Sequence, residues 1–251
     1  MLLNSNTKIY LSISSNPSIL GSEYYNNLFR KNKINSIYLP LKIKNKKNFD
    51  KLFIFLNNNP INFGGASISM PFKEHVIKHL DLKHKSVSIS FNANTILFKK
   101  KTIGFNTDCI AIKRRKEFKK IKNIILIGAG ALAKSFFKAL KKKNFYIYNR
   151  SKNKILFFKK KNSNTFIVNK KKVQNLKSFA IINATPFMNK IKIYKFFNFK
   201  DAKFILDCCI SDQSSFLQAI AAKHSILYKG GDYLYKAQRE LQKKIYLNEK
   251  F

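Results

Sequence analysis

Residues 124–133, which read I-I-L-I-G-A-G-A-L-A, constrain the fold of this chain more than any other segment. The run of four large aliphatic residues indicates a fully buried strand, and apolar residues at helical spacing from Leu132 to Leu140 indicate a helix. A tight turn joins the two, and it consists of Gly128, Ala129, Gly130 and Ala131. We therefore expect a strand, a Gly-x-Gly turn and a helix in direct succession.

This succession is typical of a site for the phosphates of a dinucleotide. Gly128 permits the tight turn, Gly130 lets the backbone approach a pyrophosphate, and the helix N-terminus presents N–H groups to it. Ala133 occupies the place of the usual third glycine, which the variant pattern allows. A lone Gly-x-Gly motif is weak evidence because glycine turns are common. The prediction therefore depends on the position of the motif between the strand and the helix.

The end of the next expected strand, residues 145–148, indicates which dinucleotide is bound. NAD-binding folds place an acidic residue about 20 positions after the first glycine, where it contacts the ribose 2′-hydroxyl. This chain has Asn149 there, followed by Arg150, Ser151 and Lys154, and no carboxylate. A guanidinium pairs with a 2′-phosphate, so the pattern favours NADP over NAD. The alternative is that Arg150 is one more solvated cation in a very basic chain.

The formal net charge of this 251-residue chain is +38. Such a charge is ordinarily typical of proteins that bind nucleic acids. Here, however, the abundant residues Lys, Asn, Ile and Phe share A/T-rich codons, and the lysines are spread over the whole chain. We therefore interpret the charge as the result of an A/T-biased genome and expect no specific nucleic-acid partner.

The cysteines and histidines do not indicate a metal centre. Cys109, Cys208 and Cys209 lack the spacing of metal ligands and suggest a reducing compartment. His75 and His79 are separated by four positions, but no third ligand is evident, so a pair on a helix surface is the simpler interpretation. The sequence has neither the apolar core of a signal peptide nor a transmembrane run. We expect a cytoplasmic protein with no membrane partner and no metal.

The first part of the chain alternates between strand and helix patterns. Strands are expected at residues 8–13, 37–41 and 64–70, and helices at residues 22–31 and 48–56. Ser22 is a plausible N-cap. Pro71 suits the first turn of a helix that carries Lys73 and continues to His79. The pattern of residues 86–98 predicts strand segments around N-A-N-T.

The same alternation continues through the second part. A helix is expected from Asp108, with Asn106 or Thr107 as its cap, and it leads into the glycine-turn strand. Strands are then expected at residues 165–168, 179–186 (ending in a polar turn), 204–210 and 225–228, with helices at residues 151–160, 215–222 and 232–247. Strands that alternate with helices in this way predict two α/β domains.

With these segments in place, the chain resembles the shikimate dehydrogenases. The resemblance is carried, in the family's order, by G-A-S-I-S-M-P-F-K (65–73), N-A-N-T (92–95), N-T-D (106–108), G-A-G-A-L-A (128–133), N-R-S (149–151) and I-N-A-T (182–185). Each motif is weak alone, and the ordered set is specific. It implies the reversible reduction of 3-dehydroshikimate to shikimate with NADPH, in aromatic amino-acid synthesis.

The resemblance also implies a domain organisation. Residues 1–105 would form an N-terminal substrate-binding domain, with the closing helix 232–251 packed back on it. Residues 106–231 would form a Rossmann-type NADP-binding domain, and the active site would lie in the cleft between the two. The expected partner is a small-molecule substrate, and the protein would be a monomer or a homodimer.

Two residues match the catalytic pair of the family. Lys73 matches its lysine, which would donate a proton to the ketone oxygen and stabilise the negative charge that develops there as the hydride arrives. Asp108 matches the partner aspartate, which would hold the lysine and a substrate hydroxyl in place. Asp108 also has a second interpretation, as a carboxylate favoured at a helix N-terminus.

Further matches concern substrate binding. Asn94 and Asn106 match asparagines near the substrate hydroxyls, and Ser69 matches a threonine that binds substrate. Gln238 matches a glutamine of the closing helix, or is an ordinary exposed helix residue. The family usually binds the substrate carboxylate with two serines of the first loop, and Ser22 can replace one of them, with a one-residue shift, but not both.

In the nucleotide half, Asn183 and Thr185 match the turn that lines the cofactor. The family often has a tyrosine three residues after the aspartate matched to Asp207, and this chain has Ile210 there. One alternative function is a quinate or shikimate-like dehydrogenase, which would favour NAD. Another is a decayed NADP-binding or basic nucleic-acid-associated protein without catalysis, for which the charge of +38 is the main support.

Overall fold

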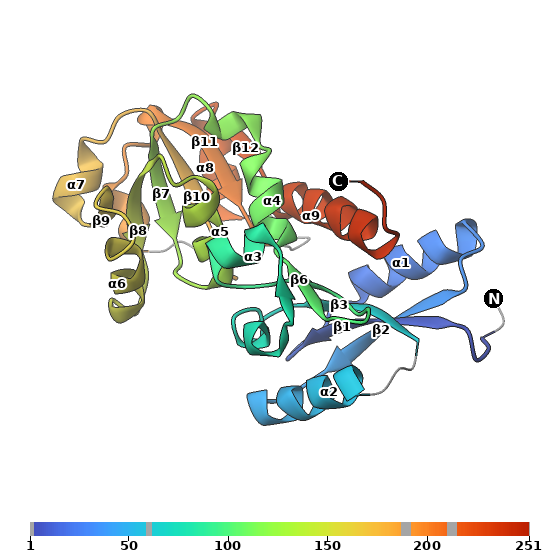
Figure 1. The fold of residues 1–251 in the computed structure, drawn as a ribbon. Coiled ribbons are helices and arrows are strands. Elements are labelled where there is room, and N and C mark those ends of the chain that lie inside the picture. Colours follow the sequence, from blue (N-terminus) through green and yellow to red (C-terminus); the bar gives the residue numbers. More distant parts are fainter. Residues whose placement is uncertain (1–2, 59–61, 187–191, 210–214, 251) are drawn as a thin grey trace. The chain divides into compact units, whose positions relative to one another are not determined.

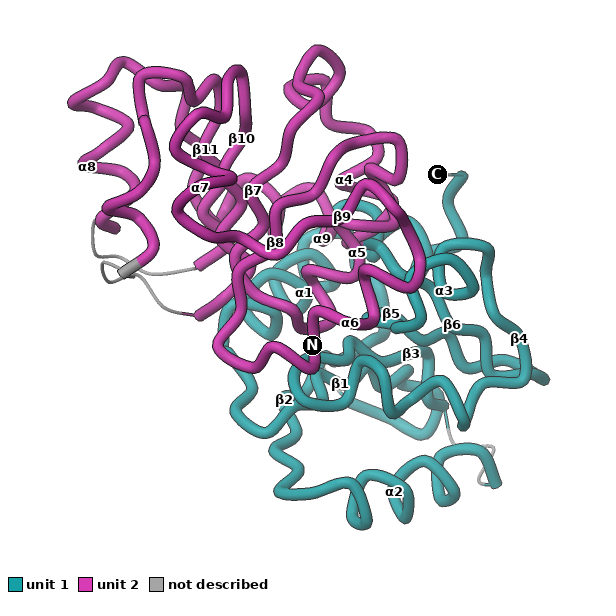
Figure 2. Tube along the Cα trace, turned by 90° about the vertical axis from the view of Figure 1, so that its left-hand side faces the viewer, with its two compact units in different colours: residues 1–107, 240–251 teal, residues 108–239 magenta. Residues whose placement is uncertain are grey.

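The computed structural model describes residues 3–58, 62–186, 192–209 and 215–250 (Figure 1). The chain divides into two compact units, one of residues 1–107 with 240–251 and one of residues 108–239 (Figure 2). Each unit is an α/β structure around its own sheet. Ile210, which the sequence comparison with the family singled out, lies outside the described residues.

The first unit contains a mixed six-stranded sheet. Its strands are β1 (Lys8–Ser14), β2 (Ser36–Lys42), β3 (Phe63–Ile68), β4 (Leu82–Lys83), β5 (Thr95–Leu97) and β6 (Ile103–Phe105). They lie in the order β2-β1-β3-β5-β6-β4, and β1 is parallel to both of its neighbours. The carboxyl ends of β1, β2 and β3 therefore meet at one edge of the sheet, which is where open α/β sheets bind ligands.

Helices cover both faces of this first sheet. They are α1 (Ile19–Lys31), α2 (Lys46–Asn58), the 3-10 helix η1 (His75–His79) and α3 (Lys85–Ser90). The alternation of β1 explains why α1 and α2 lie on opposite faces (Figure 1). Leu11 and Ile13 pack in one core cluster with Phe49 of α2, whereas Tyr10 packs in another with Tyr25 of α1.

The second unit contains a parallel sheet with the Rossmann strand order. Its strands are β7 (Asn123–Ile127), β8 (Asn144–Tyr148), β9 (Thr165–Ile167), β10 (Phe179–Asn183), β11 (Ala202–Asp207) and β12 (Leu227–Lys229). All neighbouring strands are parallel, in the order β12-β11-β10-β7-β8-β9. If β7 to β12 are renumbered 1 to 6 in chain order, the order across the sheet, starting from β9, is 3-2-1-4-5-6. This is the arrangement of a dinucleotide-binding fold. The predicted α/β class with a Rossmann-type domain is confirmed.

Apolar helix faces pack on both sides of the second sheet. The helices are α4 (Thr107–Lys113), η2 (Lys116–Phe118), α5 (Ala131–Ala139), α6 (Asn153–Lys159), α7 (Lys170–Gln174), η3 (Lys192–Phe196), η4 (Phe199–Asp201), α8 (Phe216–Lys223) and α9 (Gly231–Tyr246). Ile125 and Ile127 pack with Val173 of α7 and Leu217 of α8. Within the described residues, no helix is both long and apolar enough to span a membrane.

The last helix, α9, is divided between the two units. Residues up to Arg239 belong to the second unit, and those from Glu240 onward belong to the first. In the first unit, the ring centroids of Tyr246 and Tyr10 are 4.8 Å apart. Gln242 is buried and contacts Thr95 at the start of β5. The two compact units therefore divide inside α9, whereas the sequence predicts a domain boundary at residue 231. The assignment of a substrate-binding and an NADP-binding domain remains a prediction.

Two expectations about α1 and α3 are wrong. The first helix begins at Ile19, and its N-cap is Ser18, whose hydroxyl accepts a hydrogen bond from the N–H of Leu20 at 3.2 Å. Ser22 therefore lies inside α1. Residues 85–90 form helix α3, not a strand, because His84 caps the helix and Phe91 ends it in the left-handed region at φ 55°.

Candidate active site

The segment that carries Lys73 follows β3 at the carboxyl edge of the first sheet. It is a turn and not the expected α-helix, because Phe72 turns into the core against Phe49 and only the short helix η1 follows. The backbone N–H of Ser69 donates to the carbonyl of Ile13 at 2.9 Å, and the carbonyl of Lys73 accepts from the N–H of Ala93 at 2.8 Å. These bonds fix the backbone of the lysine beside the N-A-N-T segment.

Asn94, in that segment, is buried and its side-chain oxygen is bound within the protein. It accepts from the N–H of Thr107 at 2.8 Å, and from the hydroxyls of Thr107 and Thr95, both at 3.0 Å. The backbone of Asn94 also joins β3 to β6, because its carbonyl accepts from Ile68 and its N–H donates to Phe105. Asn94 therefore holds the segment that precedes Asp108.

Asn106 is completely buried in an internal cluster of small polar side chains. Its Nδ2 donates to the hydroxyl of Ser90 and to the side-chain oxygen of Asn92, both at 2.7 Å. Its backbone N–H donates to the hydroxyl of Ser86 at 2.9 Å. These contacts join α3 to the end of β6, so Asn106 positions the backbone in front of α4.

The thiols beside Asp108 remain protonated near neutral pH. Burial and the neighbouring Asp108 carboxylate raise the pKa of the Cys109 thiol to about 11. Burial and the carboxylates of Asp207 and Asp108 also raise the pKa of Cys208 well above its ordinary value. Because a thiol reacts as its thiolate, these two cysteines are poorly suited to act as nucleophiles.

Two serine hydroxyls in the first unit are buried without a hydrogen-bond partner among the described residues. One belongs to Ser14, the last residue of β1, and the other to Ser22 on α1. A buried hydroxyl without a partner costs about 1–3 kcal/mol, so a ligand or a water molecule is expected to complete the bonding. Sequence reasoning missed Ser14, although it lies at a strand end in front of Asn16-Pro17, where a binding loop begins.

Gln238 is half-buried on α9, and the next turn of the helix carries a second glutamine that sequence reasoning missed. Nε2 of Gln242 donates to the hydroxyl of Thr95 at 2.9 Å, and its Oε1 accepts from the hydroxyl of Tyr25 at 3.0 Å. The spacing of four residues was the available signal, since it places both glutamines on one helix face. Gln242 fixes the end of α9 to the strand that follows Asn94.

The glycine turn has the geometry that its sequence predicts. Gly128 has a φ of +107°, and a Cβ there would lie 3.0 Å from the carbonyl oxygen of Ala184, so the position requires glycine. Gly130 is exposed and is the N-cap of the nine-residue helix α5, and a Cβ there would meet no atom within 4 Å. Ala133 is completely buried where the helix packs on the sheet. The open space at Gly130 suits a phosphate group at the helix N-terminus.

Polar residues follow β8 directly. The side-chain amide of Asn149 donates to the carbonyl of Ser151 at 2.9 Å, which shapes this turn. Arg150, Ser151 and Lys154 are exposed. Because residues 149–154 include no carboxylate, the turn offers positive charge where an NAD-binding fold has an acidic residue.

The ends of β10 and β11 carry a buried polar pair. Nδ2 of Asn183 donates to Oδ1 of Asp207 at 2.9 Å, while Oδ1 of Asn183 accepts from the hydroxyl of Thr185 at 2.7 Å. Oδ2 of Asp207 has no partner among the described residues. Ala184 and Thr185 also lie against Gly128, so this turn and the glycine turn form one edge of the second unit.

The fold and these strand-end residues define a two-unit α/β protein whose second unit has the dinucleotide-binding form. Residues 17–96 match the family model of the shikimate dehydrogenase substrate binding domain. The chain is 33% identical over 157 residues to a shikimate dehydrogenase (NADP(+)) of Pyrococcus furiosus, covering 60% of this chain and 56% of that protein. It is 28% identical over 233 residues to the shikimate dehydrogenase (NADP(+)) of Pelagibacter ubique, covering 88% and 86%.

A solved structure of a shikimate 5-dehydrogenase-like protein has the same fold. Its TM-score is 0.83 at 22% identity, over 99% of this chain and 94% of that one. The chain is related by sequence and by fold to the shikimate dehydrogenases, which confirms the resemblance inferred from the motifs. This chain spans 56% to 64% of the length of the first relatives that it matches.

Proposed function

We propose that the protein is an NADP-dependent shikimate dehydrogenase that reversibly reduces 3-dehydroshikimate to shikimate in aromatic amino-acid synthesis. The observation that carries this proposal is the bond between the Lys73 carbonyl and the Ala93 N–H, because it joins the two most specific motifs of the first unit. Both motifs lie within or at the end of the matched family model. The relatives, which are shikimate dehydrogenases (NADP(+)), support the same substrate and cofactor.

The proposed reaction adds a hydride to the ketone carbon and a proton to its oxygen. NADPH bound at the glycine turn would supply the hydride. The Lys73 ammonium group donates a hydrogen bond to the ketone oxygen, stabilises the charge that develops there and transfers the proton. Asp108 orients the lysine and a substrate hydroxyl. In the reverse direction the neutral lysine accepts the proton from the alcohol.

The other predicted residues have positioning and binding roles in this proposal. Ser69, Asn94 and Gln238 would contact substrate hydroxyls, and Asn106 would hold the segment in front of Asp108. Ser22 would bind the substrate carboxylate, and the unpartnered hydroxyl of Ser14 supports a second serine in this role.

The cofactor residues form two groups at the edge of the second sheet. Gly128, Ala129, Gly130 and Ala131 would hold the pyrophosphate. The 2′-phosphate would be bound by Asn149, Arg150, Ser151 and Lys154. Asn183 and Thr185 would line the nicotinamide side. These residues belong to the proposed NADP-binding domain 106–231.

We also assign the protein to the cytoplasm, as a monomer or a homodimer without a specific nucleic-acid partner. The relatives are shikimate dehydrogenases, whose substrate is a small molecule. The assignment predicts that NADPH binding persists at a salt concentration that abolishes non-specific nucleic-acid binding, because the latter depends on counterion release.

The test is NADPH oxidation by the purified protein with 3-dehydroshikimate. Lys73→Ala should lower turnover by roughly a hundredfold or more, whereas Lys83→Ala, which removes an exposed lysine of β4, should leave it unchanged. Circular dichroism would verify that both variants fold. If the wild type bound NADPH but gave no turnover, the enzymatic proposal would be wrong and a decayed NADP-binding protein would remain.

A further inference from the structure

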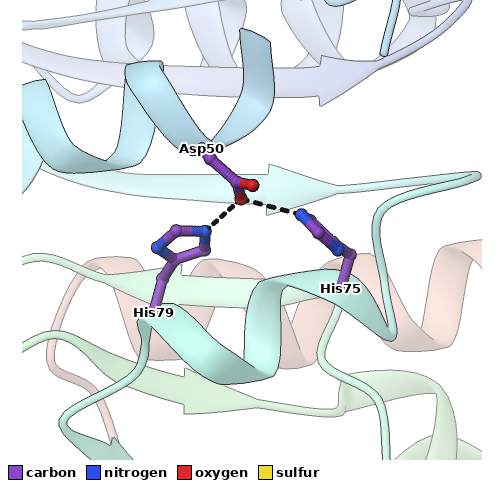
Figure 3. Close-up of side chains that lie close together, drawn as sticks. All are labelled: Asp50, His75 and His79. Atoms are coloured by element: carbon purple, nitrogen blue, oxygen red, sulfur yellow. Dashed lines mark hydrogen bonds and ion pairs between the residues drawn. The ribbon is translucent and has the colours of Figure 1, made fainter. Parts of the chain in front are cut away.

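Three side chains on the first unit converge in a cluster that has no part in the proposed reaction. Asp50 lies on α2, and His75 and His79 are the first and last residues of η1 (Figure 3). Oδ1 of Asp50 lies 2.7 Å from Nε2 of His75 and 2.6 Å from Nε2 of His79. The sequence indicated no third ligand for the two histidines, and the fold supplies one from a different helix.

The two imidazole rings are held by the core beneath them. The ring of Phe49 lies edge-on to that of His75, with the centroids 5.7 Å apart, and the centroids of the Phe53 and His79 rings are 5.3 Å apart. Both phenylalanines are completely buried. The histidines therefore have little freedom to reorient, which lowers the entropic cost of binding a ligand between them.

The cluster is also open to solvent. The exposed fractions of the side chains are 15% for His75, 12% for His79 and 27% for Asp50. The three side chains are thus partly accessible, so water molecules could serve as additional ligands.

From this geometry we propose that Asp50, His75 and His79 bind a divalent transition-metal ion such as Zn²⁺. Two imidazole nitrogens and a carboxylate oxygen form a ligand set that such ions prefer, with water in the remaining position. The three candidate ligand atoms all lie within 4.8 Å of one another. Metal–ligand bonds of about 2.0–2.2 Å in tetrahedral geometry need ligand atoms about 3.4 Å apart. Oδ1 of Asp50, now 2.7 and 2.6 Å from the two nitrogens, would have to move outward by about 0.8 Å to reach this spacing.

Lys78 orients the carboxylate for this role. Its Nζ lies 2.8 Å from Oδ2 of Asp50, which leaves Oδ1 directed at the two histidines. Metal-binding carboxylates commonly have such a partner on their other oxygen. Burial acts to raise the pKa of Asp50, but hydrogen bonds from Lys78, His79 and His75 outweigh it and hold the pKa well below its ordinary value. The carboxylate is therefore ionised near neutral pH and available as a metal ligand.

Metal binding replaces the hydrogen bonds that hold the cluster in the absence of an ion. Each Nε2 that donates a proton to Asp50 must give it up, because the metal bonds to the nitrogen lone pair. Because a proton and the metal ion compete for the same nitrogen, binding should weaken as the pH is lowered.

The bound ion would connect α2 to the segment that follows Lys73. His75 is two positions after Lys73 in the sequence. Phe72, directly before Lys73, stacks on Phe49 with the ring centroids 4.6 Å apart. The metal would thus stabilise the backbone of this segment. The site requires only the first unit, so its existence does not depend on the proposed enzymatic activity.

The test is calorimetric titration of the metal-free full-length protein with ZnCl₂. One equivalent should bind at neutral pH and raise Tm. Asp50→Asn, His75→Gln and His79→Gln should each weaken binding by at least about tenfold, whereas His224→Gln, a histidine elsewhere on the chain, should not. Thermal unfolding without metal would establish that each variant folds. Absence of binding by the wild type, or equal binding by all variants, would overturn the proposal.

A second titration excludes the cysteines as the source of the signal. Co²⁺ bound by thiolates has an intense charge-transfer band that a site of histidine and carboxylate lacks. We expect weak d–d bands without this charge-transfer band, and their loss in Asp50→Asn. A thiolate band that persists in Asp50→Asn would assign the metal to cysteine and would also overturn the proposal.

Discussion

The side-chain oxygen of Asn94 accepts two hydrogen bonds from Thr107, one from its backbone N–H at 2.8 Å and one from its hydroxyl at 3.0 Å. Thr107 is the first residue of α4, so Asn94 satisfies a donor at the N-terminus of that helix from a distant segment. Both residues are buried. The proposed substrate-binding asparagine is therefore also the residue that positions the backbone next to Asp108.

This relationship predicts a loss of stability when Asn94 is removed. Asn94→Ala should lower the free energy of unfolding by about 1–3 kcal/mol, because the buried donors of Thr107 lose their acceptor. Asn58→Ala, an exposed asparagine at the end of α2, should change it by less than about 0.5 kcal/mol. Urea titration followed by circular dichroism would measure both. Equal effects of the two substitutions would contradict a structural role for Asn94.

The two glycines of the turn should respond differently to alanine. Gly128→Ala should destabilise the protein by about 1–3 kcal/mol, because φ +107° is strained for alanine and the new Cβ approaches the Ala184 carbonyl. Gly130→Ala should cost at most about 1 kcal/mol, because its Cβ would enter open space. The same Cβ would occupy the place of the pyrophosphate, so NADPH affinity should fall in Gly130→Ala. Thermal unfolding and NADPH fluorescence titration measure the two effects separately, and unchanged NADPH affinity in Gly130→Ala would contradict the proposed phosphate site.

The turn after β8 predicts which cofactor is preferred. If Arg150 pairs with the 2′-phosphate, Arg150→Ala should weaken NADPH binding by about tenfold or more and leave NADH binding unchanged, since only NADPH has that phosphate. Lys152→Ala, an exposed cation two positions away, is the matched control. Competition titrations of both cofactors would measure this. A parallel loss of NADH affinity would mean that Arg150 acts on another part of the cofactor or only as general positive charge.

The features that the sequence predicts well are those set by neighbouring residues. Residues 124–127, directly before Gly128, are all apolar because this part of the strand is covered on both faces, and the glycine turn needs only its own backbone freedom. Residues 149–151 follow a strand of the same sheet, so their place at its carboxyl edge also follows from local order. These elements define the second unit before any tertiary contact is known.

The features that the sequence does not predict depend on contacts between distant segments. Residues 86–91 alternate in polarity as a strand does, yet residues 85–90 form α3, because the hydroxyl of Ser90 donates to the carbonyl of Ser86 at 2.7 Å and accepts from Asn106. The hydrogen-bonding groups of these small polar residues thereby find partners inside a helix, although the alternating pattern predicts a strand. Asp50 joins His75 and His79 in the same way, through the packing of α2 on η1.

A carboxylate in the second unit should make stability depend on pH. The hydroxyl of Tyr233 on α9 donates to the carboxylate of Glu117 in η2. Burial acts to raise the pKa of Glu117, but this hydrogen bond, with Arg115 and Lys229 nearby, holds the pKa below its ordinary value. A carboxyl group whose pKa is lowered by folding stabilises the protein above its unfolded pKa of about 4.3, and the contribution disappears as the pH falls through the folded value.

Tyr233→Phe should therefore lower the free energy of unfolding at pH 7. The expected loss is about 1 kcal/mol, because the hydrogen bond is made to a charged group but is partly exposed to solvent. The difference from the wild type should shrink as the pH is lowered from about 5 to 3, because protonation of Glu117 removes the charge that strengthens the bond. In a Glu117→Gln background, the effect of Tyr233→Phe should no longer depend on pH over this range. Urea titrations of the four proteins at several pH values would measure this, and a pH-independent difference in the wild-type background would show that the phenol stabilises the protein through packing alone.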